Sequence, residues 1–207
     1  MVSSFQQFIT MASFMRFCKR LNYLFSSGVF LALMFACACA LAANSSIVIK
    51  NAELQASEDT YKLSADFDIS FNEAIEEAIN KGVPLDFLVE FQVVSPRQYW
   101  FDDEIVTLST NYTLSYHALS RQYLVSHNGR QTSYETLSEA KLELMEIDDW
   151  KVLQKSQIEK GEVYKAALLM RLDQSKLPQA LQVEAIGSED WNLVSQKYEW
   201  VLRELNK

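Results

Sequence analysis

The sequence predicts an α+β fold, in which an antiparallel sheet or β-sandwich carries two packed helices and follows an N-terminal signal helix. Most of residues 46–203 alternates apolar and polar residues, which is the pattern of strands with one buried face. Two stretches, about 71–81 and 137–147, instead carry apolar residues at helical spacing. Residues 1–42 differ from both, because they contain no acidic residue. A few helices among many alternating strands favour an α+β fold.

The first segment, residues 1–42, has the pattern of a signal peptide. Its three basic residues precede an apolar run that ends in Ala40-Leu41-Ala42. A basic region, an apolar region and two small residues around a larger one are the three parts of a secretory signal. We expect cleavage between Ala42 and Ala43, which leaves residues 43–207 as a single exported α+β domain.

An uncleaved membrane anchor is the alternative interpretation of the same segment. Residues 21–43 nearly reach the ~20 apolar residues that a spanning helix needs. Basic residues before such a span stay on the cytoplasmic side, so the domain would still lie outside. Both interpretations predict an exported, periplasmic or extracytoplasmic protein, either free or anchored to the inner membrane.

The remainder of the chain is acidic and has no cysteine. Cys18, Cys37 and Cys39 all lie in the signal segment, so the exported domain must be stable without disulfides. The whole chain has a net charge of −8, although residues 1–42 contribute only positive charge. This acidity disfavours nucleic acid and anionic lipid as partners. We therefore expect no nucleic acid as a partner, and membrane contact only through the N-terminal segment if that segment stays uncleaved.

The strands are predicted from alternation that runs through five stretches. Residues 61–69, 85–93, 106–116 and 164–172 each keep one phase throughout. The stretch 47–56 changes phase near Asn51, which predicts a β-bulge there.

The boundaries of the two helices follow from capping residues. Ser70–Glu73 and Thr136–Glu139 both have the spacing of a capping box at a helix start. Gly82 and Pro84 then end the first helix.

Two further segments complete the predicted order of elements. Asn128-Gly129 predicts a type I′ turn between strands near 118–126 and 130–134, because both central residues of that turn need a positive φ. Residues 190–205 fit either a helix or a strand. We expect a strand from Asp190 to about Trp200.

Several short segments together resemble a known family. They are Gly82–Phe87, Tyr99–Asp102, Leu114–Tyr123, Leu177-Pro178 with Leu181–Val183, and Trp191–Ser195. Over about residues 46–203 the chain resembles an uncharacterised bacterial family of exported proteins, the domain of unknown function 4390. The resemblance implies a shared fold and an exported location, and it assigns no catalytic residue.

Motifs for catalysis, cofactors and metals are missing from the sequence. The exported part has two histidines, His117 and His127, and no thiolate, which is too few soft ligands for a zinc site. The acidic clusters Asp102–Glu104 and Asp148-Asp149 lack the spacing of a calcium loop. The glycines are too scattered for a phosphate loop. We therefore predict no cofactor, no metal and no assigned catalytic residue.

The segment most indicative of function is Arg97–Glu104, which places three aromatic residues between basic and acidic ends. Aromatic residues and Arg are enriched at protein–protein contacts. We expect Arg97, Tyr99, Trp100 and Phe101 to contact a partner, in a non-catalytic binding or accessory module for another envelope or membrane protein. The alternative for this segment is that its aromatic residues belong to the core.

The alternative function is a periplasmic hydrolase. Its Ser/His/carboxylate site would be assembled from distant segments, with His117 or His127 as the base, because such triads are defined by geometry rather than by sequence order.

The signal segment generates the first testable prediction. Protein purified from an exporting host should begin at Ala43 or Asn44, because signal peptidases cut after the small-x-small pattern that ends at Ala42. Intact-mass measurement decides this. A mass that still includes Cys37 and Cys39 would contradict cleavage and support the anchor.

Overall fold

A computed structural model describes residues 45–159 and 161–202. The predicted signal helix, its cleavage site at Ala42 and Ala43 and the alternative anchor at 21–43 lie outside these residues. Within them, no helix combines the length and the hydropathy that crossing a membrane requires.

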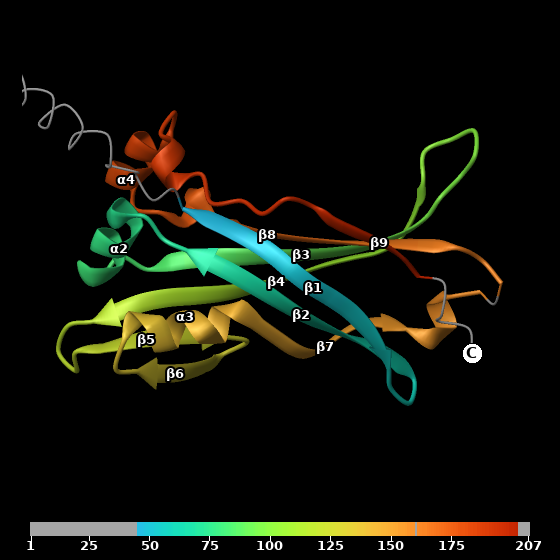
Figure 1. Cartoon of the computed structure of the whole chain (residues 1–207), viewed down its shortest axis with the longest axis horizontal. Helices are drawn as coiled ribbons and strands as arrows, with labels where there is room; N and C mark the ends of the chain where they lie inside the picture. Colours follow the sequence, from blue (N-terminus) through green and yellow to red (C-terminus); the bar gives the residue numbers. More distant parts are fainter. Residues whose placement is uncertain (1–44, 160, 203–207) are drawn as a thin grey trace, which may run out of the picture. The chain divides into compact units, whose positions relative to one another are not determined.

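The described chain forms two antiparallel sheets with short helices, which confirms the predicted α+β class (Figure 1). The three-stranded sheet has the order β1-β2-β7, and the six-stranded sheet has the order β6-β5-β4-β3-β8-β9. Their bounds are β1 Ser46–Ala56, β2 Thr60–Ser70, β3 Leu85–Ser95, β4 Asp103–His117, β5 Gln122–His127, β6 Arg130–Tyr134, β7 Glu146–Gln154, β8 Tyr164–Leu172 and β9 Tyr198–Leu202.

The inner faces of the two sheets share one hydrophobic core. Alternation at 61–69 and 85–93 is confirmed, since every second side chain of β2 and β3 is buried. Phe91 of β3 contacts the other sheet, because its ring centroid lies 6.3 Å from that of Trp150 of β7. Within its own sheet, its ring centroid lies 6.2 Å from that of Trp200 of β9. The predicted bulge near Asn51 is also present, as a register shift between Ile49 and Asn51.

Three α-helices occur in the described chain, one more than predicted: α2 Glu73–Asn80, α3 Leu137–Met145 and α4 Gln179–Ala185. The capping box at Thr136 is confirmed, with the Glu139 N–H donating to Thr136 Oγ1 over 3.2 Å. The first capping box is wrong. Ser70 is the last residue of β2, where it pairs with Ser46.

The cap of α2 is instead Asn72, a buried side chain with three partners. Its Oδ1 accepts from the Ile75 N–H at 3.0 Å. Its Nδ2 donates to the carbonyl oxygen and to Oδ1 of Asp190, at 3.0 and 3.2 Å. An Asx side chain directly before the helix therefore takes precedence over the serine two positions earlier.

The C-terminal strand is shorter than the predicted Asp190–Trp200. Residues Glu189–Trp191 form a 3₁₀ turn, and β9 begins only at Tyr198. Between them Val194 forms a single bridge to Arg171. The reason is the buried side chain of Ser195, whose Oγ accepts the Met170 N–H at 3.0 Å and so replaces a carbonyl acceptor in the ladder.

The turn at Asn128-Gly129 has the predicted type I′ character, with φ of 49° and 75°. A Cβ added at Gly129 would meet no atom within 4 Å, so a substitution there acts only through the backbone conformation. Gly129→Val should therefore lower the free energy of unfolding by at least ~1 kcal/mol, because a β-branched residue tolerates positive φ poorly. Denaturant unfolding measures the loss.

Gly129→Asn is the matched control for this turn. Asn adopts positive φ at much lower cost, so most of the stability should be retained. Equal stability of the Val and Asn variants would contradict the conformational argument.

Candidate functional site

The segment predicted to contact a partner connects β3 to β4 and rises away from the larger sheet (Figure 1). Its three aromatic side chains are 89%, 76% and 86% exposed at Tyr99, Trp100 and Phe101. The alternative that they belong to the core is therefore wrong. Trp100 and Phe101 contact each other edge to face, with 6.5 Å between their ring centroids.

The base of this loop is held by Arg97. Its guanidinium forms an ion pair with Asp103 at 2.6 Å, and its backbone N–H donates to Asp102 Oδ1 at 3.2 Å. Both contacts close the loop across the end of the β3–β4 hairpin. Arg97 thus shapes the loop, while the aromatic residues at its tip face solvent.

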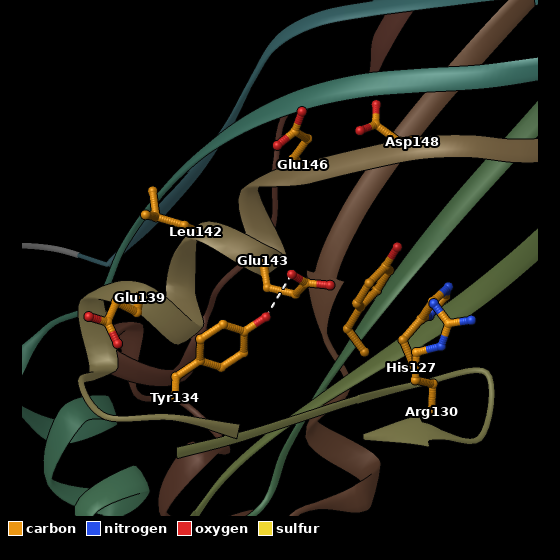
Figure 2. Close-up of a pocket in the computed structure, with 9 residues that line it drawn as sticks. His127, Arg130, Tyr134, Glu139, Leu142, Glu143, Glu146 and Asp148 are labelled. Atoms are coloured by element: carbon orange, nitrogen blue, oxygen red, sulfur yellow. Dashed lines mark hydrogen bonds between the residues drawn. The ribbon is translucent and has the colours of Figure 1, made fainter. Parts of the chain in front are cut away.

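A second feature, which the sequence analysis missed, is an open cleft of about 560 Å³ between α3–β7 and strands β4 to β6. Figure 2 shows that Glu139 and Glu143 come from α3, Glu146 and Asp148 from β7, and His127, Arg130 and Tyr134 from the β5–β6 hairpin. Leu142 of α3 and Tyr112 of β4 complete the lining.

Aromatic stacking fixes one wall of the cleft. The rings of Tyr112 and His127 lie parallel, 3.9 Å apart with an interplanar angle of 3°. His127 Nδ1 lies 3.0 Å from the Asn111 carbonyl, and Nε2 lies 2.9 Å from Asn128 Nδ2. A carbonyl oxygen only accepts, so Nδ1 carries the proton and Nε2 accepts from the amide. Both ring nitrogens are therefore engaged, Nδ1 by β4 and Nε2 by the β5–β6 turn.

Two tyrosines of the cleft have strongly shifted acidity. Tyr134 donates its hydroxyl to Glu143 Oε2 at 2.7 Å, and burial together with this hydrogen bond raises the pKa of Tyr134 to about 12. Burial, reinforced by the charges of Glu143 and Asp148, raises the pKa of Tyr112 to about 12 as well. Both phenols are neutral hydrogen-bonding groups at physiological pH.

The two histidines considered as hydrolase bases have different partners. His117 Nδ1 lies 2.9 Å from Ser120 Oγ in an exposed turn. In residues 45–159 and 161–202, neither histidine ring forms a hydrogen bond or ion pair with a carboxylate. The same residues contain no group of three or more His, Cys, Asp or Glu that could hold a metal ion.

One sequence signal could have located the cleft. Glu146 and Asp148 alternate with the buried Ile147 along β7, so both point to the face opposite the core side chain. Asp148 was noted only as part of an acidic cluster. Glu143 lines the same cleft as Glu146 and Asp148 because the connection between α3 and β7 is short. No sequence motif marks this connection.

These features define the class of the protein as an antiparallel α+β domain with an exposed aromatic loop and an acidic cleft. The chain belongs to the family described as a domain of unknown function (DUF4390), whose family model matches residues 44–201. This confirms the family that the sequence resembles. No curated protein and no solved structure is significantly similar to the chain.

The pair Tyr134–Glu143 predicts a pH dependence. The ordinary pKa of a tyrosine is 10.0 and that of folded Tyr134 is about 12, so the unfolded chain releases this proton first. The stabilisation is complete below pH 10 and is lost as the pH rises toward 12. As the pH rises from 10 to 12, the melting temperature of the Tyr134→Phe variant should therefore fall less steeply than that of the unaltered chain.

A phenolate absorbance titration supplies the control for this experiment. Tyr134→Phe should remove one late-titrating phenol and leave that of Tyr112 in place. Parallel melting profiles for the two proteins between pH 10 and 12 would contradict the assigned pKa.

Proposed function

We propose that the protein is a non-catalytic binding module that contacts another envelope or membrane protein through the loop Arg97–Glu104. The observation that carries this proposal is the exposure of three consecutive large aromatic side chains, Tyr99, Trp100 and Phe101. Side chains of this kind are otherwise found mostly in interiors and at interfaces, where their area contributes much of the binding energy.

The closed base of the loop supports the same function. The contacts from Arg97 to Asp102 and Asp103 restrict the loop before any partner arrives. Ordering that is already present in the free protein does not have to be acquired on binding, so a preorganised loop binds more tightly.

Charge favours a protein over a lipid surface as the partner. Asp102, Asp103 and Glu104 follow the aromatic tip directly, and Arg97 is the one basic residue of the segment 97–104. An anionic membrane surface would repel such a tip. The partner that fits it is a protein with an apolar pocket bordered by basic side chains, which complements both the rings and the charges.

Replacing Trp100 by Ala tests the proposal. Since Trp100 is 76% exposed, the free energy of unfolding should change by less than about 1 kcal/mol. In-cell cross-linking should lose the partner. With the identified partner purified, affinity should fall about 30-fold, because a truncated aromatic anchor costs ~2 kcal/mol or more.

Leu119→Ala is the matched control, because Leu119 is also a large apolar residue, 92% exposed in a hairpin turn. This variant should retain the partner at unchanged affinity. Equal effects of the two variants would contradict a specific contact at Trp100. Binding of the unaltered chain to anionic vesicles through Trp100, without a protein partner, would also overturn the proposal.

A further inference from the structure

The cleft of Figure 2 carries an excess of negative charge. Four carboxylates line it, from Glu139, Glu143, Glu146 and Asp148, against the single guanidinium of Arg130. Glu139 is committed to the capping box of α3. Within the described chain, the carboxylates of Glu146 and Asp148 accept no hydrogen bond and form no ion pair.

A nearly buried tyrosine at the same place points independently to a ligand. Tyr112 is only 6% exposed, and in the described residues its hydroxyl has no hydrogen-bond partner. No side-chain polar atom of the described chain is both buried and without a partner, so this hydroxyl is accessible from the cleft that Tyr112 lines. The charges of Glu143 and Asp148 act on the same hydroxyl, so a ligand that reaches it also meets these carboxylates.

The arrangement suits an organic cation better than a metal ion. A metal needs several ligands around one point, and no group of three or more candidate ligands in the described chain is close enough together. An ammonium or guanidinium group carries several N–H donors, and its carbon body needs room. The cleft volume of about 560 Å³ lies in the range of small-molecule sites, and Leu142, 64% exposed, offers an apolar surface for methylene groups.

We propose that this cleft binds an organic cation, with the ammonium or guanidinium group donating to Tyr112 Oη, Glu143 and Asp148 and the carbon chain packing along Leu142. The Tyr112 oxygen accepts a hydrogen bond from the cation, and the hydroxyl proton remains free to donate to a carboxylate. The site is separate from the aromatic loop and does not depend on its function.

Calorimetric titration of the chain purified from an exporting host tests this site. Two probes carry the cation: spermidine, and a blocked tripeptide with a central lysine. The same tripeptide with an acetylated lysine keeps the size and removes the charge. Both cations, or one of them, should bind saturably at low salt, and the acetylated peptide should bind at least about tenfold more weakly.

Tyr112→Phe and Asp148→Asn locate the binding. The first keeps the ring that stacks on His127 and removes only the hydroxyl, and the second removes one exposed charge. Each should weaken the cation about tenfold, as expected for a hydrogen bond to a charged group. Asp149→Asn is the control, because Asp149 is paired with Lys62 at 3.0 Å and its φ of 56° suits Asn. It should change affinity by less than about twofold.

The probes separate the two sources of such a cation. Preference for spermidine supports a free polyamine, and preference for the lysine peptide supports a basic side chain of a protein. Three results would overturn the proposal: no saturable binding of either cation, equal binding of the acetylated peptide, or equal effects of Asp148→Asn and Asp149→Asn. Calcium binding that depends on Tyr112 and Asp148, without binding of the organic cations, would also overturn it.

Discussion

The structure depends on the burial of strand β3 between two neighbouring strands and beneath the second sheet. β3 pairs with β4 on one side and with β8 on the other. Its inner side chains are 0% exposed: Leu85, Phe87, Val89, Phe91 and Val93. Close packing of such a row leaves little freedom in the register of either neighbour. The outer face adds specificity, since Asp86 accepts from Thr113 Oγ1 and Glu90 pairs with Arg171.

Both surfaces with proposed roles are attached to this strand. The aromatic loop follows the end of β3 at Ser95, and the cleft is built on Tyr112 of β4, which lies opposite Phe87. About nine residue pairs along one hairpin separate them, which corresponds to roughly 30 Å. Substitutions in the two sites should consequently act independently, because they share no side chain.

Local patterns were sufficient to predict the parts of the fold that local physics decides. Alternation located β2, β3, β4 and β8, because each exposes one face and buries the other. The turn at Asn128-Gly129 was found for a similar reason, since few residue pairs accept two positive φ angles. The error at Ser70 arose because two capping residues compete within three positions, and only the contact with Asp190 identifies Asn72.

The remaining features are determined by contacts distant in the sequence. The side chain of Ser195 takes the place of a ladder acceptor ahead of β9 because it lies beside the Met170 N–H. Helix α4 has too short an apolar pattern to be distinguished from a loop. The exposure of Trp100 follows from the length of the connection between β3 and β4. The aromatic composition of this connection would suit a core equally well. The cleft was missed because its carboxylates come from different elements and look, one by one, like ordinary surface residues.

The cap of α2 joins two segments that lie far apart in the sequence. Asn72 stabilises the first turn of this helix, but its amide is satisfied by Asp190, a residue 118 positions later. Strand β3 likewise gains its second neighbour only when β8 is present. A chain that lacks Asp190 has a helix with an incomplete cap, and one that also lacks β8 has a central strand with an open edge. Folding of this domain therefore depends on contacts between residues far apart in the sequence, which slow folding and leave strand edges exposed until they form.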